Sequence, residues 1–471
     1  MNNSNQTEPC PELHRVIVEK LFGLFDHDIS LNRSAGVTII YGANGVGKTR
    51  IFQVLNALSR RRFGIIYNTP FRRLALEFVD ETRFEILQDE IRSRDNRDHL
   101  QKGKRDLELN LIRLGCDRVS KMLTSRDEDV DALLEHWTEL KASYLNRVGP
   151  DHWINEITNE TLTSDDVVKE LMEKSELPPR VRRVLEDQED SAPDEIDTFL
   201  SNLRIDFIDT HRLNVKAVGS GSERWSRRSN LLRSRSLPKR TVDVYAEDLS
   251  REIEDYLTKY AGISSRFDRT FPQRALSLSE NEESTDKVRE QYDKLTKLRE
   301  RLASTGILEE TDELPSWPDR ELDKTERRFL ALYLEDTQEK LAVFDGLLGR
   351  LELLAKILDE RFLFKKMRTD YKRGFFFVSS LEQELGVDQL SSGEQHELIL
   401  AYRLLFKLES SSLVLIDEPE ISLNVAWQQK FLDDIIEIRD LTNIKFLIAT
   451  HSPQIIHNRW DLARELGNHV E

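Results

Sequence analysis

The chain has 471 residues, of which 33% are charged and 38% are hydrophobic, and its formal net charge at pH 7 is −17. This length is sufficient for two or three domains with a sizeable buried core. The composition is typical of a globular protein with much exposed helix. The acidic balance argues against a protein that grips DNA along its whole surface, because such proteins are usually basic.

Targeting signals and cysteines bear on the cellular compartment. No apolar run approaches the roughly 18–20 residues of a membrane span, and the N-terminus lacks the basic and apolar segments of a secretory signal. The two cysteines, Cys10 and Cys116, are too few for a disulfide framework or a cysteine zinc site. We therefore expect a cytoplasmic protein without a membrane partner.

The first 90 residues are typical of an α/β lobe. Apolar and β-branched runs predict strands at 14–22, 27–31 and 37–42, and a glycine-rich turn separates the third from a helix at 49–62. Two alternating segments around a polar turn predict a hairpin at 74–87. Residues 1–90 are therefore expected to form the N-terminal lobe of an α/β domain.

The middle of the chain is more charged. Residues 91–203 have few strand signals and predict a helical insertion that ends in an acidic linker at 186–195. Residues 204–282 are expected to hold a short strand at 204–209 and a basic stretch at 219–240.

Two apolar seams predict paired helices within 283–364. Pro315 and Pro318 break the chain between them, so an antiparallel, coiled-coil-like pair is expected; packing of each helix against the main domain is the alternative. The seam residues are Val288, Tyr292, Leu295, Leu298 and Leu302 in the first helix, and Leu341, Phe344, Leu348, Leu351, Leu354 and Leu358 in the second.

The tail returns to α/β character. Buried strands are expected at 412–419 and 445–451, with a helix at 427–441 between them. Residues 365–471 are therefore expected to form the C-terminal lobe of the same domain.

A phosphate-binding loop is the strongest local signal. The segment Gly-Ala-Asn-Gly-Val-Gly-Lys-Thr lies between a strand and a helix, where backbone N–H groups and the helix dipole favour phosphate. Lys48 is expected to contact the β- and γ-phosphates, and the Thr49 hydroxyl to bind Mg²⁺. The candidate nucleotide-binding residues here are Gly42, Asn44, Gly45, Gly47, Lys48 and Thr49.

Two carboxylates follow the apolar run that ends at Ile416. A buried strand that delivers acids to its end is suited to a Walker B motif, with Asp417 at Mg²⁺ and Glu418 polarising the attacking water. Acids often end strands, but together with a P-loop the pattern indicates an ATP site.

With Leu-Ser-Ser-Gly-Glu before this strand and Ala-Thr-His-Ser-Pro after it, the chain resembles the ABC ATPase family, in its RecF/SMC/Rad50-like branch. The resemblance covers about 14–90 and 365–471 and implies an ABC ATPase head. It implies that the signature residues Ser391, Ser392 and Gly393 bind ATP held by a second subunit, and that His451 contacts the γ-phosphate. The alternative for His451 is a hydrogen-bonded histidine at a strand end.

Other positions depart from the family pattern or remain open. Asn424 stands where relatives carry a charged or histidine D-loop residue, and its amide is expected to hydrogen-bond across a dimer. Gln88 is a candidate for the Q-loop glutamine, although an exposed glutamine is the alternative we favour. His211 carries no assigned role.

The pairing of signature and P-loop in trans implies at least a homodimer, or a higher homo-oligomer, that binds ATP and Mg²⁺. The segments at 256–274, 390–406 and 416–435 resemble ATPase subunits of anti-phage systems such as PARIS and Septu. This resemblance implies a sensor and scaffold that controls a separate effector nuclease, of Toprim or HNH type, in response to a phage-encoded trigger. Because only 20 residues follow His451, we expect no C-terminal Toprim domain, and the scattered histidines do not predict an HNH cluster.

The alternative function is a RecF-like DNA-repair ATPase that clamps DNA directly. It depends on the basic stretch, in which arginines and lysines lie near Trp225. A solvated loop or a dock for an acidic protein would carry the same residues, so DNA contact stays open. A third alternative is purely structural ATP binding with slow turnover. The basic residues are Arg224, Arg227, Arg228, Arg233, Arg235, Lys239 and Arg240.

Overall fold

The computed structural model separates into two compact units, residues 1–240 with 408–471 and residues 241–407. Within them, the structure describes residues 11–90, 105–113, 118–123, 145–149, 152–155, 160–162, 167, 171, 195–209, 241–277, 284–308, 316–318, 320–386 and 389–466. Cys10, Cys116, His211 and the basic stretch at 224–240 lie outside these ranges. Among the described helices, none is both long and apolar enough to cross a bilayer.

A five-stranded parallel sheet forms the centre of the first unit. Its strands, in spatial order, are β11 (Ile205–Asp209), β15 (Leu413–Asp417), β16 (Lys445–Thr450), β3 (Val37–Tyr41) and β17 (Ala463–Glu465). Leu415 packs into the core that also contains α1 (Lys48–Ser59), while Val414, which points to the other face, is equally buried. The sheet is therefore covered on both faces, as parallel sheets require.

The helices on this sheet follow from their apolar periodicity. Ile51, Phe52, Leu55 and Leu58 form the buried stripe of α1, which packs against β11 and β15. The helix α12 (Val425–Thr442) packs against β16. The strands expected at 37–42, 412–419 and 445–451 and the helices at 49–62 and 427–441 are confirmed.

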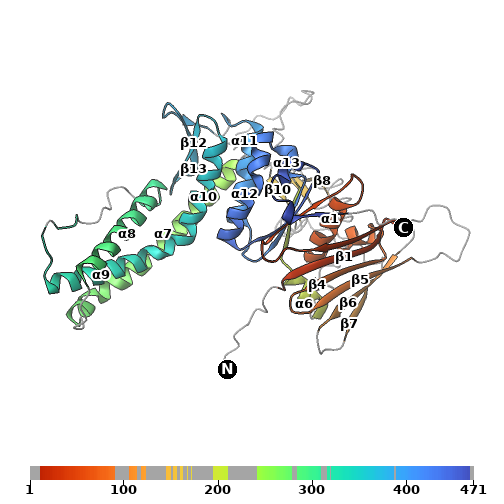
Figure 1. Ribbon diagram of the computed structural model, residues 1–471, viewed down its shortest axis with the longest axis horizontal. Helices are drawn as coiled ribbons and strands as arrows, with labels where there is room; N and C mark the ends of the chain where they lie inside the picture. The colour runs from red at the N-terminus through yellow and green to blue at the C-terminus, as the bar shows by residue number, and fades with distance from the viewer. Residues whose placement is uncertain are drawn as a thin grey trace, which may run out of the picture. The chain divides into compact units, whose positions relative to one another are not determined.

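A six-stranded antiparallel sheet is also part of the first unit (Figure 1). The predicted hairpin at 74–87 is confirmed and forms two strands of this sheet, β4 (Arg73–Phe78) and β5 (Arg83–Glu90). In spatial order the strands are β2 (Phe25–Ser30), β1 (Leu13–Leu21), β4 (Arg73–Phe78), β5 (Arg83–Glu90), β6 (Arg105–Ile112) and β7 (Val119–Leu123).

The helical character expected for residues 91–203 is wrong for most of the described part. Besides β6 and β7, a small sheet of β8 (Leu145–Gly149), β9 (His152–Asn155) and β10 (Glu160–Leu162) is present, and the main helix described there is α6 (Glu195–Ser201). Leu107, Leu109 and Leu111 of β6 alternate with polar residues and are all buried. This alternation is typical of a strand, but the many charged residues of 91–203 favoured the helical prediction.

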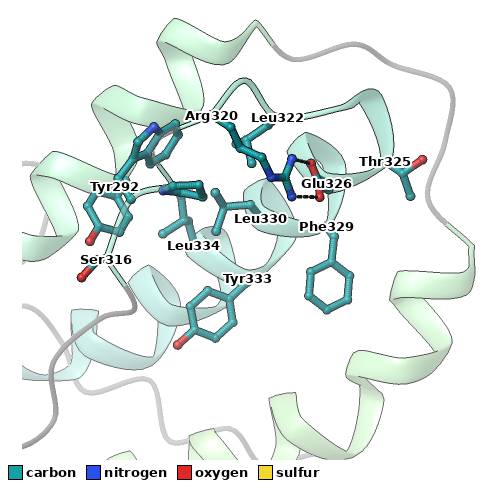
Figure 2. A pocket seen from close by; sticks show the side chains of 12 residues that line it. Tyr292, Ser316, Arg320, Leu322, Thr325, Glu326, Phe329, Leu330, Tyr333 and Leu334 are labelled. Carbon is teal, nitrogen blue, oxygen red and sulfur yellow. Dashed lines mark hydrogen bonds and ion pairs between the residues drawn. The ribbon is translucent and has the colours of Figure 1, made fainter.

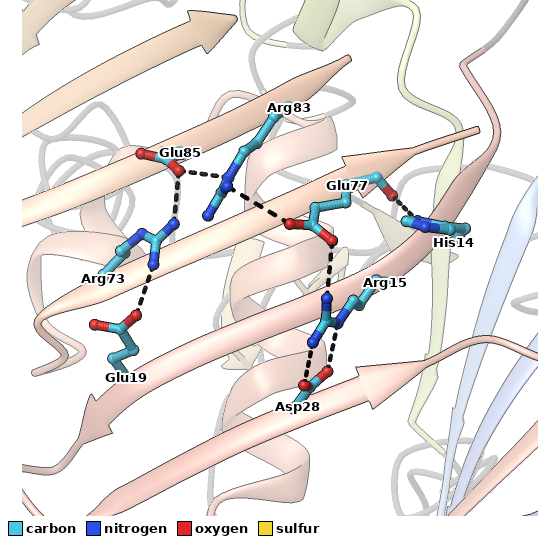
Figure 3. A network of polar contacts seen from close by, with 8 residues as sticks. All are labelled: His14, Arg15, Glu19, Asp28, Arg73, Glu77, Arg83 and Glu85. Atoms are coloured by element: carbon cyan, nitrogen blue, oxygen red, sulfur yellow. Dashed lines mark hydrogen bonds and ion pairs between the residues drawn. The ribbon is translucent and has the colours of Figure 1, made fainter. Parts of the chain in front are cut away.

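A ladder of alternating charges crosses the neighbouring strands β2, β1, β4 and β5 (Figure 3). Arg15 bonds Asp28 at 2.5 Å and Glu77 at 3.3 Å, and Arg73 bonds Glu19 and Glu85 at 2.7 Å each. Arg83 joins Glu85 to Glu77. Hydrogen bonding to Arg15 holds the pKa of Asp28 below its ordinary value. The arginines on this face are thus compensated by carboxylates, so the face is not a patch of one sign.

The second unit begins with helices. The helix α7 (Thr241–Leu276) occupies the stretch expected to be mixed strand and loop up to 282, and is followed by α8 (Thr285–Ser304) and α9 (Lys324–Leu341). The chain then passes through a 3₁₀ turn (Ala342–Phe344) into α10 (Asp345–Arg361). Figure 1 shows α7, α8 and α9 running alongside one another.

The expectation that the two seam helices pair with each other is wrong. α8 packs against α9, while α10 packs against the strand β12 (Lys365–Asp370) and the helix α11 (Ser392–Tyr402). The 3₁₀ turn divides the predicted second seam, so its residues face different neighbours. The other elements described in the second unit are β13 (Gly374–Ser379), β14 (Glu384–Leu385) and a π-helical turn (Arg403–Lys407).

A cavity of about 600 Å³ lies between α8, α9 and the segment that joins them (Figure 2). Trp317, Tyr333 and Phe329 give it an apolar lining, and Arg320 at its edge forms a two-pronged ion pair with Glu326. The predicted nucleotide-site residues do not line this cavity.

Candidate functional site

The P-loop connects the end of β3 to the start of α1, as the sequence predicts. Gly45 and Gly47 have φ angles of 86° and 96°, a region that side chains with a Cβ rarely adopt. A Cβ at Gly47 would lie 2.4 Å from Leu21 Cδ2, and one at Gly42 would lie 2.9 Å from the Leu466 carbonyl oxygen. The loop is therefore built for glycine at these positions, and Asn44, Gly45 and Thr49 are exposed along it.

Lys48 lies beneath this loop and is only 5% exposed. Its Nζ donates hydrogen bonds to the carbonyl oxygens of Gly42 (2.9 Å) and Ala43 (3.1 Å). Burial lowers the pKa of Lys48, although Asp417, Glu418 and Glu420 oppose this effect. The lysine is thus held against the loop and faces a group of carboxylates.

Strand register brings these carboxylates to the P-loop. Asp417 of β15 lies opposite Ala449 of β16, and Thr450 lies opposite Tyr41 of β3. The carboxyl ends of parallel strands share one edge, where open α/β sheets bind ligands. Asp417 is buried, at 2% exposure. The sequence-predicted P-loop, Asp417 and Glu418 therefore meet at one edge.

Glu418 and His451 face each other across this edge. His451 Nε2 lies 3.7 Å from Glu418 Oε1, a distance for an ion pair with protonated imidazole but too long for a direct hydrogen bond. Glu418 has φ 47° and ψ 56°, and its N–H donates to the Ala449 carbonyl oxygen at 2.8 Å. A non-glycine residue in the left-handed region costs energy and is often found at functional sites.

Glu420 belongs to the same group and was not singled out in the sequence. One carboxylate oxygen accepts a hydrogen bond from Thr450 Oγ1 and the other from the His451 N–H, both at 2.8 Å. The available signal was a second acid two positions after Glu418, in Asp-Glu-Pro-Glu. Acids near strand ends are common, so that signal alone did not indicate a contact with the next strand.

Asn424 is the N-cap of α12. Its Oδ1 accepts a hydrogen bond from the Trp427 N–H at 3.0 Å, which satisfies one of the first amide groups of the helix. The side-chain oxygen is therefore engaged within its own chain, and the expected contact across a dimer depends on the amide nitrogen.

The predicted signature lies in the second unit, at the start of α11. Ser391 caps this helix in a reciprocal box with Glu394: Ser391 Oγ accepts from the Glu394 N–H at 3.3 Å, and Glu394 accepts from the Ser391 N–H at 2.7 Å. Ser391 and Ser392 are exposed and Gly393 is half-buried. The amino end of α11 therefore offers hydroxyl and backbone donors suited to an anion.

Two ion pairs support this helix. Lys365 bonds Glu394 at 2.8 Å, and Arg361 of α10 forms a buried ion pair with Glu397. Burial raises the pKa of Glu394, but Lys365 and the hydrogen bonds to Ser391 outweigh it and hold the pKa below its ordinary value.

Gln88 is buried, at 8% exposure, so the favoured reading of an exposed glutamine is wrong. Its side-chain oxygen accepts from the Phe71 N–H at 3.0 Å, and its amide donates to the Ile66 carbonyl oxygen at 3.4 Å. These bonds tie β5 to α2 (Phe63–Tyr67) and to the segment that follows it, which is a structural task.

The oxygen and nitrogen donors at the sheet edge fit ATP and a hard cation. The exposed Thr49 hydroxyl and the Asp417 carboxylate are ligand types that Mg²⁺ prefers. The glycine-lined loop before α1 leaves backbone N–H groups to meet phosphate. The chemistry of the residues present therefore agrees with the predicted ligands.

Comparisons with known proteins agree with a nucleotide site. A family model described as AAA ATPase domain matches residues 13–456. An Escherichia coli protein named "Retron Ec83 probable ATPase" is 37% identical over 84 residues, which are 16% of this chain. The match spans 15% of that relative's length.

Solved SMC head domains align over nearly the whole chain. One, from Pyrococcus furiosus with an extended coiled coil and bound to the C-terminal domain of ScpA, is 12% identical with a TM-score of 0.28, covering 95% of this chain and 92% of that one. Another, from Thermotoga maritima, is 9% identical with a TM-score of 0.31, covering 96% and 92%.

Proposed function

Because this chain belongs to the AAA ATPase domain family, we propose that its ATPase activity drives a sensor and scaffold subunit of an anti-phage defence system. In this proposal the assembly controls a separate effector nuclease. The observation that carries the ATP chemistry is the meeting of Lys48, Asp417 and Glu418 at one sheet edge. The similarity to a retron ATPase supports the defence role.

Substrate binding is assigned to the P-loop and its lysine. Lys48 exchanges its bonds to the Gly42 and Ala43 carbonyls for the β- and γ-phosphates of ATP, and loop N–H groups contact the same phosphates. Thr49 and Asp417 would hold Mg²⁺, which when bound neutralises phosphate charge.

Hydrolysis is assigned to Glu418 and His451. Glu418 accepts a hydrogen bond from the attacking water and orients it, while His451, 3.7 Å away, contacts the γ-phosphate from the next strand. The left-handed backbone of Glu418 helps to aim the carboxylate.

We propose a homodimer, or a higher homo-oligomer, because the chain carries one P-loop and one signature and the family that it resembles pairs them between subunits. The P-loop belongs to one compact unit and the signature residues Ser391, Ser392 and Gly393 to the other. In the family that the sequence resembles, the signature of one subunit completes the ATP site of its partner. The capped amino end of α11 has the donors for that task.

The effector and the trigger are proposed from the resemblance to anti-phage ATPases. A Toprim-type or HNH nuclease would be the bound effector, and a phage-encoded protein would release it. The competing DNA-clamp function needs a basic surface. The chain carries a net charge of −17, and the basic stretch on which that function depends lies outside the described residues. We therefore favour the defence role.

One variant tests the ATPase assignment and the dimer together. Glu418→Gln should lower ATP turnover at least 100-fold while ATP binding is retained, and light scattering should detect an ATP-dependent dimer. Asp433→Asn, at an exposed position of α12, is the control and should behave as wild type. Turnover of Glu418→Gln at the wild-type rate would remove Glu418 from its role.

The defence role is tested by isolation of the tagged protein from its native host, with its chromosomal neighbours expressed. A stoichiometric nuclease identified by mass spectrometry would support the role. Recovery of nucleic acid without a protein partner would favour the DNA clamp instead.

A further inference from the structure

The carboxylate of Glu420 spans two consecutive residues at the end of β16. Oε2 accepts a hydrogen bond from Thr450 Oγ1 and Oε1 accepts one from the His451 N–H, each at 2.8 Å. Thr450 is fully buried, and its hydroxyl also accepts from the Ser452 N–H at 3.0 Å. Bonds to an ionised carboxylate are roughly twice as strong as neutral ones, so this clamp fixes the backbone that carries the His451 side chain.

Gln428 of α12 supports the clamp from behind. Its amide donates to the Glu420 carbonyl oxygen at 3.2 Å and to the Leu423 carbonyl oxygen at 3.0 Å. Its side-chain oxygen accepts from Ser452 Oγ at 2.9 Å. The residues on both sides of the clamp are thus bonded to one helix, which restricts their movement.

Glu420 is also within electrostatic reach of the phosphate-binding lysine. Together with Asp417 and Glu418 it opposes the effect of burial on the pKa of Lys48. Of these three carboxylates, Asp417 and Glu418 already have proposed tasks at Mg²⁺ and water. The carboxylate oxygens of Glu420 are instead directed to Thr450 and His451.

From this geometry we infer that Glu420 is a positioning residue for ATP hydrolysis, which holds His451 at the γ-phosphate and opposite Glu418. The inference rests on the proposed role of His451. Because its carboxylate oxygens bond Thr450 and His451 and not the P-loop, Glu420 is expected to act on the rate of the chemical step more than on ATP binding.

Steady-state kinetics of full-length variants test this inference. Glu420→Ala should lower kcat at least 10-fold while KM for ATP changes less than about threefold, since the lost interaction acts in the transition state. Glu420→Gln keeps one acceptor oxygen for the His451 N–H and should recover most of kcat. Thr450→Val removes the other bond and should give an intermediate kcat. Asp433→Asn is the carboxylate-removing control and should match wild type.

Comparison with His451→Ala separates the inference from the function on which it rests. If His451→Ala is slow but Glu420→Ala has a kcat within twofold of wild type, the positioning role is overturned and the role of His451 stands. If His451→Ala turns over normally, both assignments are overturned. A Glu420→Ala variant whose KM rises as much as its kcat falls, without recovery by Gln, would also overturn the positioning role.

Discussion

The carboxyl edge of the parallel sheet and the amino end of α11 both carry predicted ATP-site residues, but different forces hold them. At the sheet edge, Asp417 and Lys48 are buried and strand register fixes their place. At α11, Ser391 is exposed and is held by a capping box and by the ion pairs of Glu394 and Glu397. Packing therefore holds the residues of the sheet edge in place, whereas ion pairs hold the amino end of α11. The stability of the two sites should respond differently to substitution and to pH.

The largest effect is expected at the buried ion pair behind α11. Arg361→Leu leaves Glu397 as an uncompensated buried charge, which costs about 3–5 kcal/mol of unfolding free energy. Chemical unfolding should detect the loss, and ATP binding at the sheet edge should persist. Arg361→Leu combined with Glu397→Leu should recover most of the stability. A cost below about 1 kcal/mol for the single variant would mean that the pair does not hold α11.

Lys48→Ala should weaken ATP binding at least 100-fold, about 2.7 kcal/mol, because the buried ammonium that faces the phosphates is removed. Titration calorimetry measures this change. Arg464→Ala, which removes an exposed cation from β17, is the matched control and should bind ATP as wild type does. Unchanged affinity in Lys48→Ala would refute the P-loop assignment.

Gly47→Ala tests how tightly packing defines the P-loop. The left-handed φ of 96° costs about 1–2 kcal/mol for alanine, and the contact with Leu21 adds to this cost. Gly346→Ala in α10 meets open space and should stabilise the protein by about 0.5–1 kcal/mol. Thermal unfolding should move in opposite directions for the two variants. A shift in the same direction would contradict the packing argument.

Glu394→Gln should have the smallest effect, about 1 kcal/mol at pH 7, and this effect should depend on pH. The pKa of Glu394 is lower in the folded protein than its ordinary value, so the ionised form stabilises the fold above the unfolded-state pKa. The contribution is lost as pH falls through the folded-state pKa. Unfolding free energies of wild type and variant should therefore converge at acidic pH. A difference that stays constant down to about pH 3 would show that charge is not what holds the cap.

The sequence allowed prediction of the elements whose signals are local. The P-loop flanks, the hairpin and the two buried strands of the tail have apolar runs with clear ends, and all were found at their predicted places. The meeting of Lys48 with Asp417 also followed, because parallel strands share one edge.

Predictions failed for elements and residues whose structure depends on contacts with residues distant in sequence. β6 forms a strand because it extends the sheet beside β5, although its charges suggested helix. The predicted second seam is divided by a 3₁₀ turn, and α8 packs against α9, which precedes that turn. Glu420 could not be recognised because its task depends on a neighbouring strand 30 residues away in sequence.

The pairing of β3 with β16 and β17 has a consequence for protein synthesis. β3 is made early, but its hydrogen-bonding partners are Lys445–Thr450 and Ala463–Glu465, and the Leu466 N–H bonds the Tyr41 carbonyl oxygen beside the P-loop. A nascent chain on the ribosome therefore carries an unpaired, apolar β3 until nearly all of the described residues have emerged. The strand that leads into the P-loop therefore gains its sheet partners only late in synthesis.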